Sequence, residues 1–311
     1  MESRATVITK EQIAGAKKGD LFSGVVMIQE ANIALTKTGK EYIQGNLMCG
    51  VAVPFKAWSS YNSFTEFKNN DYSGMTALVT GEFDDFGGFT SMLVKSVTAV
   101  EGYDESEFME TKYDAEGYWT GLKETYQMCV ESDFAKNLAD RVLFNNTEVA
   151  EKFKLEFAAK SHHDNCKSGL LAHTYKVVSN MGYILRAYPT LKVNKDLVMF
   201  GALIHDIGKL KEMHYGVYQE FSFVTHRYLG LEYLEPYKDD IIKEWGEKGW
   251  YEIVSILLQH HGEFGDSCRT LSSFLVHKAD WLDADLTLIT QTVENNPEIE
   301  SVRIQDYFLT I

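Results

Sequence analysis

Residues 201–209 read Gly201-Ala-Leu-Ile-His205-Asp206-Ile-Gly208-Lys209, an apolar run that ends in neighbouring histidine and aspartate side chains. His205 offers an imidazole nitrogen and Asp206 a carboxylate oxygen, a donor pair that suits Mn, Fe, Zn or Ni better than Ca. Gly208 is typical of a helix end, and Lys209 places a cation where an anionic substrate could lie. The segment therefore predicts a helix that ends at a metal site.

The second half of the chain holds further histidines and aspartates in similar surroundings. They lie in Gly169-Leu-Leu-Ala-His173-Thr174, at His226, in His260-His261-Gly262 and in His277-Lys-Ala-Asp280-Trp-Leu-Asp283. A single histidine among apolar residues is more often a satisfied core residue than a ligand, but the order and types of this set favour a metal centre. The ligands expected for a first metal are His173, His205, Asp206 and Asp280. Those expected for a second metal are His226, His260 and His261, with Asp206 shared between the two ions.

Two neighbours of these ligands suggest supporting roles. Asp280 follows apolar residues on a helix, where an unpartnered carboxylate is costly to bury, and a salt bridge is the alternative to a metal there. His277 lies three residues before Asp280 on the same helix face. We therefore expect His277 and Asp283 to orient ligands rather than to bind the ion themselves.

Roles in catalysis and substrate binding fall on a few further residues. Asp206 is the expected catalytic carboxylate, and Lys209 beside it would neutralise charge that develops on a phosphate. His162 and His163, followed by Asp164, fit substrate contacts, a further ligand pair or a solvated loop. We expect His162 and His163 to contact the substrate.

Composition limits the classes of protein that this chain can be. Its 311 residues, 45% hydrophobic and 24% charged, can bury one large core or two moderate ones. No stretch reaches the roughly 18 uninterrupted apolar residues of a membrane helix, and the N-terminus lacks the layout of a signal peptide. The four cysteines, Cys49, Cys129, Cys166 and Cys268, show no CxxC spacing. They indicate reduced thiols in a cytoplasmic protein.

The net charge of −15 counts against a nucleic-acid enzyme, because phosphate contacts need lysine and arginine. The first hundred residues hold 9 Lys and Arg against 10 Asp and Glu, so nearly all of the excess lies in the remainder. Divalent cations bound there would offset part of it. The charge therefore weakens the prediction of nucleic-acid binding without removing it.

Residues 1–100 predict a small β-barrel. Short β-branched or apolar runs cover residues 21–28, 42–48 and 75–80, and turn signals at 38–40, 49–50 and 84–88 separate the strands. A polar stretch over residues 60–71 could hold one helix. About five strands with a helix between the third and fourth is the order of an OB-type barrel. A small barrel or sandwich of another type is the alternative.

Residues 101–118 are acidic, contain Gly102 and Gly117, and predict a linker. Beyond them helical patterns dominate, over residues 125–144, 170–186, 197–205, 252–261 and 271–289. There is no βαβ alternation, no glycine-rich phosphate loop and no obvious repeat. The expected fold is α+β and multidomain, with a nucleic-acid-binding barrel at 1–100, a linker at 101–118 and an all-α metal domain at 119–311.

Four motifs resemble the HD-domain phosphohydrolases and, among them, the YhaM-type 3′-5′ exoribonucleases. The motifs are Ala158–His163 with Ser168–Thr174, His205-Asp-Ile-Gly-Lys209, Gln259-His-His-Gly262, and Leu275-Val-His-Lys-Ala-Asp-Trp-Leu-Asp-Ala284. Leu35–Lys40 and Val53–Trp58 also look like the barrel of that family. The resemblance implies an OB-type barrel followed by an HD-type helical domain. It also implies a cytoplasmic 3′-5′ exonuclease that releases nucleoside monophosphates from single-stranded RNA, with DNA left open, and it suggests a homo-oligomer. Mn is the expected cofactor, as one or two ions per chain.

Aromatic and basic residues of the barrel would grip a single strand by stacking and backbone contacts. The expected contacts are Phe55, Trp58, Phe86 and Phe89 with Lys37, Lys40 and Lys56. The alternative for each aromatic residue is a place in the barrel core. Lys37 and Lys40 beside Gly39 are the positions that the sequence clearly marks as exposed.

Two other functions remain open at this point. One is hydrolysis of a small nucleotide, such as a cyclic dinucleotide or a deoxynucleoside triphosphate, which shares the metal chemistry but has no evident use for the barrel. The other is a non-enzymatic single-strand-binding protein with a structural metal. The substitution Asp206→Ala would separate these functions, because it should abolish hydrolysis and spare strand binding.

Overall fold

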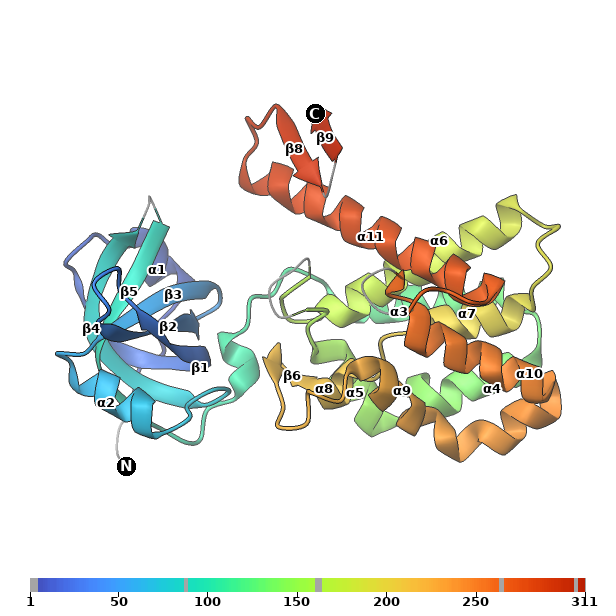
Figure 1. Ribbon diagram of the computed structural model, residues 1–311, viewed down its shortest axis with the longest axis horizontal. Helices are drawn as coiled ribbons and strands as arrows, with labels where there is room; N and C mark the ends of the chain where they lie inside the picture. Colours follow the sequence, from blue (N-terminus) through green and yellow to red (C-terminus); the bar gives the residue numbers. More distant parts are fainter. Residues whose placement is uncertain (1–4, 87–88, 160–163, 263–265, 305–306, 311) are drawn as a thin grey trace. The chain divides into compact units, whose positions relative to one another are not determined.

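The computed structural model describes residues 5–86, 89–159, 164–262, 266–304 and 307–310. The chain divides into two compact units, Met1–Thr111 and Lys112–Ile311 (Figure 1). Within the described ranges, no helix is both long enough and apolar enough to cross a membrane.

The N-terminal unit is a closed barrel in which the strand order is β1-β2-β3-β5-β4. The strands are β1 (Leu21–Leu35), β2 (Glu41–Met48), β3 (Ala52–Trp58), β4 (Thr76–Phe86) and β5 (Phe89–Ala99). Helix α2 (Asn62–Asn69) lies between β3 and β4 in the chain, which confirms the predicted OB-type order. A short helix α1 (Lys10–Gly15) precedes the barrel and a 3-10 turn η1 (Glu105–Phe108) follows it.

The first strand is longer than the sequence pattern predicts, because it bends and pairs with two neighbours. Residues 21–27 pair with β4, residues 27–35 pair with β2, and a bulge lies between Ile28 and Glu30. The bend brings β1 close to Gly45 of β2, where a Cβ atom would lie 1.9 Å from the carbonyl oxygen of Glu30. Glycine is therefore required at this point of close approach.

The C-terminal unit is mainly helical and also contains two short hairpins. Its principal helices are α3 (Ala115–Cys129), α4 (Asp133–Ala139), α5 (Thr147–Leu155), α6 (Gly169–Ala187), α7 (Lys195–Ile204), α8 (Lys209–Glu212), α9 (His226–Leu234), α10 (Lys238–Gln259) and α11 (Leu271–Asn295). Shorter turns are η2 (Asp140–Phe144), a π-helix, and η3 (Glu235–Tyr237), a 3-10 helix. The hairpins are β6 (Met213–His214) with β7 (Val217–Tyr218), and β8 (Ser301–Ile304) with β9 (Tyr307–Thr310).

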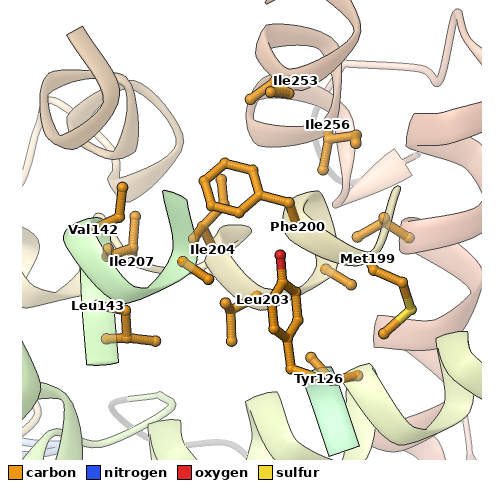
Figure 2. Close-up of a cluster of buried hydrophobic side chains, with 14 of the residues drawn as sticks. Tyr126, Val142, Leu143, Met199, Phe200, Leu203, Ile204, Ile207, Ile253 and Ile256 are labelled. Carbon is orange, nitrogen blue, oxygen red and sulfur yellow. The ribbon is translucent and has the colours of Figure 1, made fainter. Parts of the chain in front are cut away.

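Helix α7 forms the centre of this unit. Every residue from Leu197 to Ile204 is buried, so the helix is apolar on all sides. Figure 2 shows its side chains among those of α3, η2 and α10, and a Cβ atom at Gly201 would lie 2.4 Å from the Cδ1 atom of Ile256. This packing holds the residues that follow α7, His205 and Asp206, inside the unit.

Candidate metal centre

The histidines of the centre are held so that their Nε2 atoms face inward. His205 donates from Nδ1 to the carbonyl oxygen of Ala202 at 2.8 Å, and His260 donates from Nδ1 to that of Leu257 at 3.0 Å. A donor role at Nδ1 leaves Nε2 with its lone pair free to bind a cation. The ends of α7 and α10 thus orient two ligands through their own backbone carbonyls.

Carboxylates orient two further histidines in the same way. Asp283 Oδ2 lies 2.7 Å from His173 Nδ1, and Glu212 Oε2 lies 2.8 Å from His226 Nδ1. Glu212 also accepts a hydrogen bond from the backbone nitrogen of His226 at 3.0 Å. His277 donates from Nδ1 to the carbonyl oxygen of His260 at 2.6 Å, which ties α11 to the end of α10. Such partners fix the tautomer and the direction of a metal-binding imidazole.

The structure brings all seven expected ligands together in two groups. One group is His173, His205 and Asp280, and the other is Asp206, His226, His260 and His261. Within each group the ligand atoms lie within 4.8 Å of one another. These residues come from α6, α7, α9, α10 and α11 or from the residues just after those helices. Segments that are far apart in the sequence therefore converge on one small volume.

Asp206 faces both groups. Its Oδ2 atom lies 3.5 Å from His173 Nε2 and 3.4 Å from His205 Nε2. Its Oδ1 atom lies 3.5 Å from both His226 Nε2 and His260 Nε2. A carboxylate in this position can offer one oxygen to each of two cations.

The donor set fits divalent transition-metal ions. Asp206 Oδ1 and His260 Nε2 are buried and have no hydrogen-bond partner among the residues described. His173 Nε2 and His205 Nε2 lie 3.2 Å apart, and His226 Nε2 and His261 Nε2 lie 3.1 Å apart. Buried polar atoms without partners are costly, and a cation between them removes that cost. Imidazole nitrogen with carboxylate oxygen suits Mn, Fe, Zn or Ni.

A third cluster, Asp164, His173 and Asp283, also has closely spaced ligand atoms. Lys176 pairs with both of its carboxylates, since its Nζ atom lies 2.9 Å from Asp164 Oδ2 and 3.1 Å from Asp283 Oδ1. Tyr113 donates a further hydrogen bond to Asp164. Asp164 is therefore part of a buried ion-pair network, and the idea that it lies in a solvated loop is wrong.

The charges of the centre shift the pKa values of its members strongly. Burial opposes ionisation of Asp206, but Lys209 and His205 outweigh burial and hold the pKa of this carboxyl well below its usual range. Burial lowers the pKa of His173, yet Asp280 and Asp283 overcome it and raise this pKa to about 10. Burial and His260 lower the pKa of His261 to about 2. The neighbouring carboxylates thus favour the protonated form of His173, whereas burial and a neighbouring imidazole favour the neutral form of His261.

A cavity of about 590 Å³ opens beside the centre. His173, Asp206, Lys209, His261 and Asp280 line it, together with residues of α11 and β8. Lys209 Nζ lies 2.5 Å from Asp206 Oδ2, so the lysine pairs with the carboxylate while it borders the cavity. This position leaves the ammonium group next to any anion that reaches the centre.

The barrel unit holds the other expected contacts. Lys37 and Lys40 are exposed in the turn between β1 and β2. The Trp58 ring is half-buried, packs 5.1 Å from that of Tyr42, and has Lys56 Nζ 5.9 Å from its centroid. Lys56, Tyr42, Gln44, Asn46 and Pro54 border a hollow of about 300 Å³ on the barrel surface.

Phe55 does not fit its expected role. Only 1% of it is exposed, and its ring packs 5.2 Å from that of Phe67 in the barrel core. Because a base needs an open ring face, Phe55 cannot be a stacking surface. Phe89 is 75% exposed. His162, His163 and the side chain of Phe86 lie outside the described residues.

Comparison with known proteins now identifies the helical unit. Residues 170–285 match the family model of the HD domain. The helical unit carries an HD domain. All seven expected ligands lie within the matched segment, and so do the orienting residues Glu212, His277 and Asp283.

The curated relatives named YhaM resemble the chain over most of its length. The 3′-5′ exoribonuclease YhaM of Oceanobacillus iheyensis (strain DSM 14371) is 24% identical over 298 residues, which cover 92% of this chain and 90% of that protein. YhaM of Listeria monocytogenes serotype 4b (strain CLIP80459) is 24% identical over 230 residues, 69% of this chain and 70% of the relative. A dihydroneopterin 2′,3′-cyclic phosphate phosphodiesterase of Methanocaldococcus jannaschii is 27% identical over 138 residues, 42% of this chain and 51% of the relative. Together with the HD domain, these relatives support a metal-dependent phosphohydrolase.

Three parts of the site escaped the sequence analysis. Glu212 reaches His226 across 14 positions, and Lys176 reaches Asp283 across more than a hundred, so neither pairing leaves a local pattern. Tyr42 was also missed. It lies two residues before Gln44 in a predicted strand, so both side chains are on the same face of the strand, and that face borders the surface hollow.

Proposed function

We propose that this chain is a metal-dependent 3′-5′ exonuclease that hydrolyses phosphodiester bonds of single-stranded RNA to nucleoside monophosphates. The observation that carries the proposal is the position of Asp206, with one carboxylate oxygen toward each of two histidine groups. A relative that aligns with 92% of this chain is named a 3′-5′ exoribonuclease, which supports the direction of attack and the polymeric substrate.

The residues that would hold the metal are those of the two groups. His173, His205 and Asp280 would bind one ion, His226, His260 and His261 would bind a second, and Asp206 would be shared. Mn is the ion we propose, because imidazole with carboxylate suits it and the resemblance to the YhaM-type enzymes implies it. When bound, such ions lower the pKa of water and stabilise charge on phosphate oxygens.

The chain itself contributes positioning and charge. Asp283 and Glu212 hold His173 and His226 in fixed orientations, so the centre needs little rearrangement when a cation binds. Lys209 is paired with Asp206 and borders the cavity, which places a positive charge near the phosphate that is cleaved.

The barrel would bind the strand upstream of the cleaved bond. Exposed Lys37 and Lys40 would contact phosphates, and the surface around Trp58, Tyr42 and Lys56 would receive bases. We also place the enzyme in the cytoplasm and expect it to self-associate, as the resemblance suggests.

The proposal is tested by incubating the protein and Mn²⁺ with 5′-labelled single-stranded RNA, with matched DNA and with bis-p-nitrophenyl phosphate. We expect an RNA ladder that shortens from the 3′ end and is absent with Asp206→Ala. Asp239→Ala, which replaces an aspartate that lines neither the cavity nor the centre, is the control. Cleavage in the interior of the RNA, or full activity of Asp206→Ala, would refute the proposal.

A second candidate is a phosphodiesterase for a small cyclic phosphate ester. The relative from Methanocaldococcus jannaschii, which aligns with 42% of this chain, favours it. Under this alternative the small diester is hydrolysed while both polymers stay intact, and the barrel has no part in catalysis.

A further inference from the structure

The cavity beside the metal centre continues beyond the expected ligands. In addition to the ligands, it is lined by Trp281, Ala284, Leu288, Arg303 and Ile304. Its volume of about 590 Å³ falls in the range of roughly 300–1,000 Å³ that is usual for small-molecule sites. The cavity is therefore large enough to hold a substrate group as well as the group that reacts.

One face of α11 forms the floor of this extension. Asp280, Trp281, Ala284, Asp285 and Leu288 line the cavity, and their spacing places them in a single stripe along the helix. Asp280 belongs to the metal centre, and Leu288 lies eight residues further on, roughly 12 Å along the helix axis. The stripe thus extends the cavity away from the centre along α11.

The side chain of Trp281 is firmly positioned on this floor. Its ring meets the His277 ring edge to face, with centroids 4.9 Å apart, and Lys278 Nζ lies 5.1 Å from its centroid. Trp281 also donates a hydrogen bond to Asp285, one helical turn further along. A fixed indole that lines a cavity offers a flat surface for a nucleobase, whatever the base.

Strand β8 brings a cation to the far part of the cavity. Val302 and Ile304 are buried and anchor the strand, and Arg303 between them is exposed and lines the cavity. A guanidinium group binds phosphate through two parallel hydrogen bonds. Arg303 lies outside the segment that matches the HD domain, which ends at residue 285. The C-terminal hairpin therefore adds a basic group to a cavity that the HD domain builds.

We propose that this extension binds the nucleotide on the 5′ side of the cleaved bond. Trp281 stacks on its base, Leu288 and Ile304 contact the same base from the apolar wall, and Arg303 binds its 5′ phosphate. The proposal rests on the proposed exonuclease function and specifies which part of the strand lies where. It gives β8 a role in substrate binding, whereas none of the seven expected metal ligands lies in β8.

The test uses the Mn²⁺-loaded enzyme and three short RNA substrates. The first is a dinucleotide with a 5′ phosphate, the second is the same dinucleotide without that phosphate, and the third keeps the phosphate but lacks the base of the 5′ nucleoside. The variants are Trp281→Ala, Trp281→Phe and Arg303→Gln. Arg186→Gln, which removes the same charge from a residue that does not line the cavity, is the control. Thermal melting verifies that each variant is folded.

We expect Trp281→Ala to raise KM for the substrates with a base about 5- to 150-fold, with little change for the substrate without it. Trp281→Phe should restore most of the loss. Arg303→Gln should remove the preference for the 5′-phosphorylated dinucleotide, a loss of roughly 10- to 100-fold. Equal effects of each variant on all three substrates would overturn the proposal, because a merely structural role affects all of them alike.

The same experiment separates failure of this proposal from failure of the proposed function. If the wild-type enzyme hydrolyses the dinucleotides while Trp281→Ala and Arg303→Gln affect all three substrates equally, the proposed subsite is refuted, and the proposed exonuclease function is not. If the wild-type enzyme hydrolyses neither the dinucleotides nor longer RNA, the exonuclease is wrong and the subsite is overturned with it.

Discussion

Replacing Asp206 with asparagine keeps the size of the side chain and removes one negative charge from between the two histidine groups. The carboxylate lies 3.4–3.5 Å from four imidazole nitrogens and 2.5 Å from Lys209 Nζ. Loss of a partner that only orients a ligand costs 10- to 100-fold in metal affinity, so loss of this shared ligand should cost at least about 100-fold. Lys209, whose side chain is 13% exposed, would also lose its nearest counter-charge, which should lower the free energy of unfolding by about 3 kcal/mol at most.

Both effects are measurable on the same variant. Titration calorimetry with Mn²⁺ gives the affinity, urea unfolding in the presence of a chelator gives the stability, and RNA hydrolysis gives the activity. The double variant Asp206→Asn with Lys209→Met is the control, because it removes the unpaired ammonium group and should recover most of the stability but none of the hydrolysis. Hydrolysis by Asp206→Asn within tenfold of the wild type at equal Mn²⁺ would refute the shared-ligand role.

Three further predictions concern metal, pH and the barrel. Mn²⁺ at 100 times its Kd should stabilise the native protein by about 2.7 kcal/mol, and calorimetry should show the Tm of the helical unit raised by roughly 5–10 °C; an equal shift in Asp206→Asn would contradict this. In metal-free protein the pKa of His261 is about 2 in the native state and 6.5 in the unfolded chain. Below pH 6.5 the unfolded chain therefore binds a proton that the native state does not, and the free energy of unfolding should fall as the pH drops. Native His173 keeps its proton up to about pH 10, so the free energy of unfolding should also fall as the pH rises above 6.5. The urea midpoint should therefore peak near pH 6.5, and a loss of stability in acid that His261→Gln leaves unchanged would contradict this prediction. Phe55→Ala should destabilise the barrel by about 3–5 kcal/mol, whereas Trp58→Ala should weaken RNA binding by roughly 1–3 kcal/mol in fluorescence anisotropy; the reverse pattern would mean that the two aromatic roles are exchanged.

The order of elements in the barrel was predictable because local signals mark it. Turn residues such as Gly39 and Gly50 adopt positive φ, and they separate runs with strand-like alternation. The full length of β1 was not predictable, since the strand continues through a bulge and pairs with two strands, β2 and β4, that lie apart in the sequence. Phe55 was within reach of the sequence, because it shares a strand face with Val53 and Ala57, both of which are buried.

The residues that gather in the candidate metal centre were predictable, and so were two of their supports, His277 and Asp283. Histidine and aspartate at helix ends or within apolar runs are rare combinations, and the amino-acid sequence alone marks them as candidate ligands. Glu212, Lys176 and Arg303 leave no such trace, because each comes next to the centre or its cavity only after distant segments pack together. The short hairpins of the helical unit also have too few residues to produce an alternating pattern.

The most direct test is a Mn²⁺ titration of chelator-treated protein in which bound metal and RNA hydrolysis are followed together. We expect no hydrolysis from metal-free protein, and a rate that rises with metal bound to the groups that share Asp206. Release of mononucleotides from the 3′ end should reach its maximum when those groups are filled. Full hydrolysis without bound metal, or filled groups with no hydrolysis of any phosphodiester, would contradict a metal-dependent exonuclease.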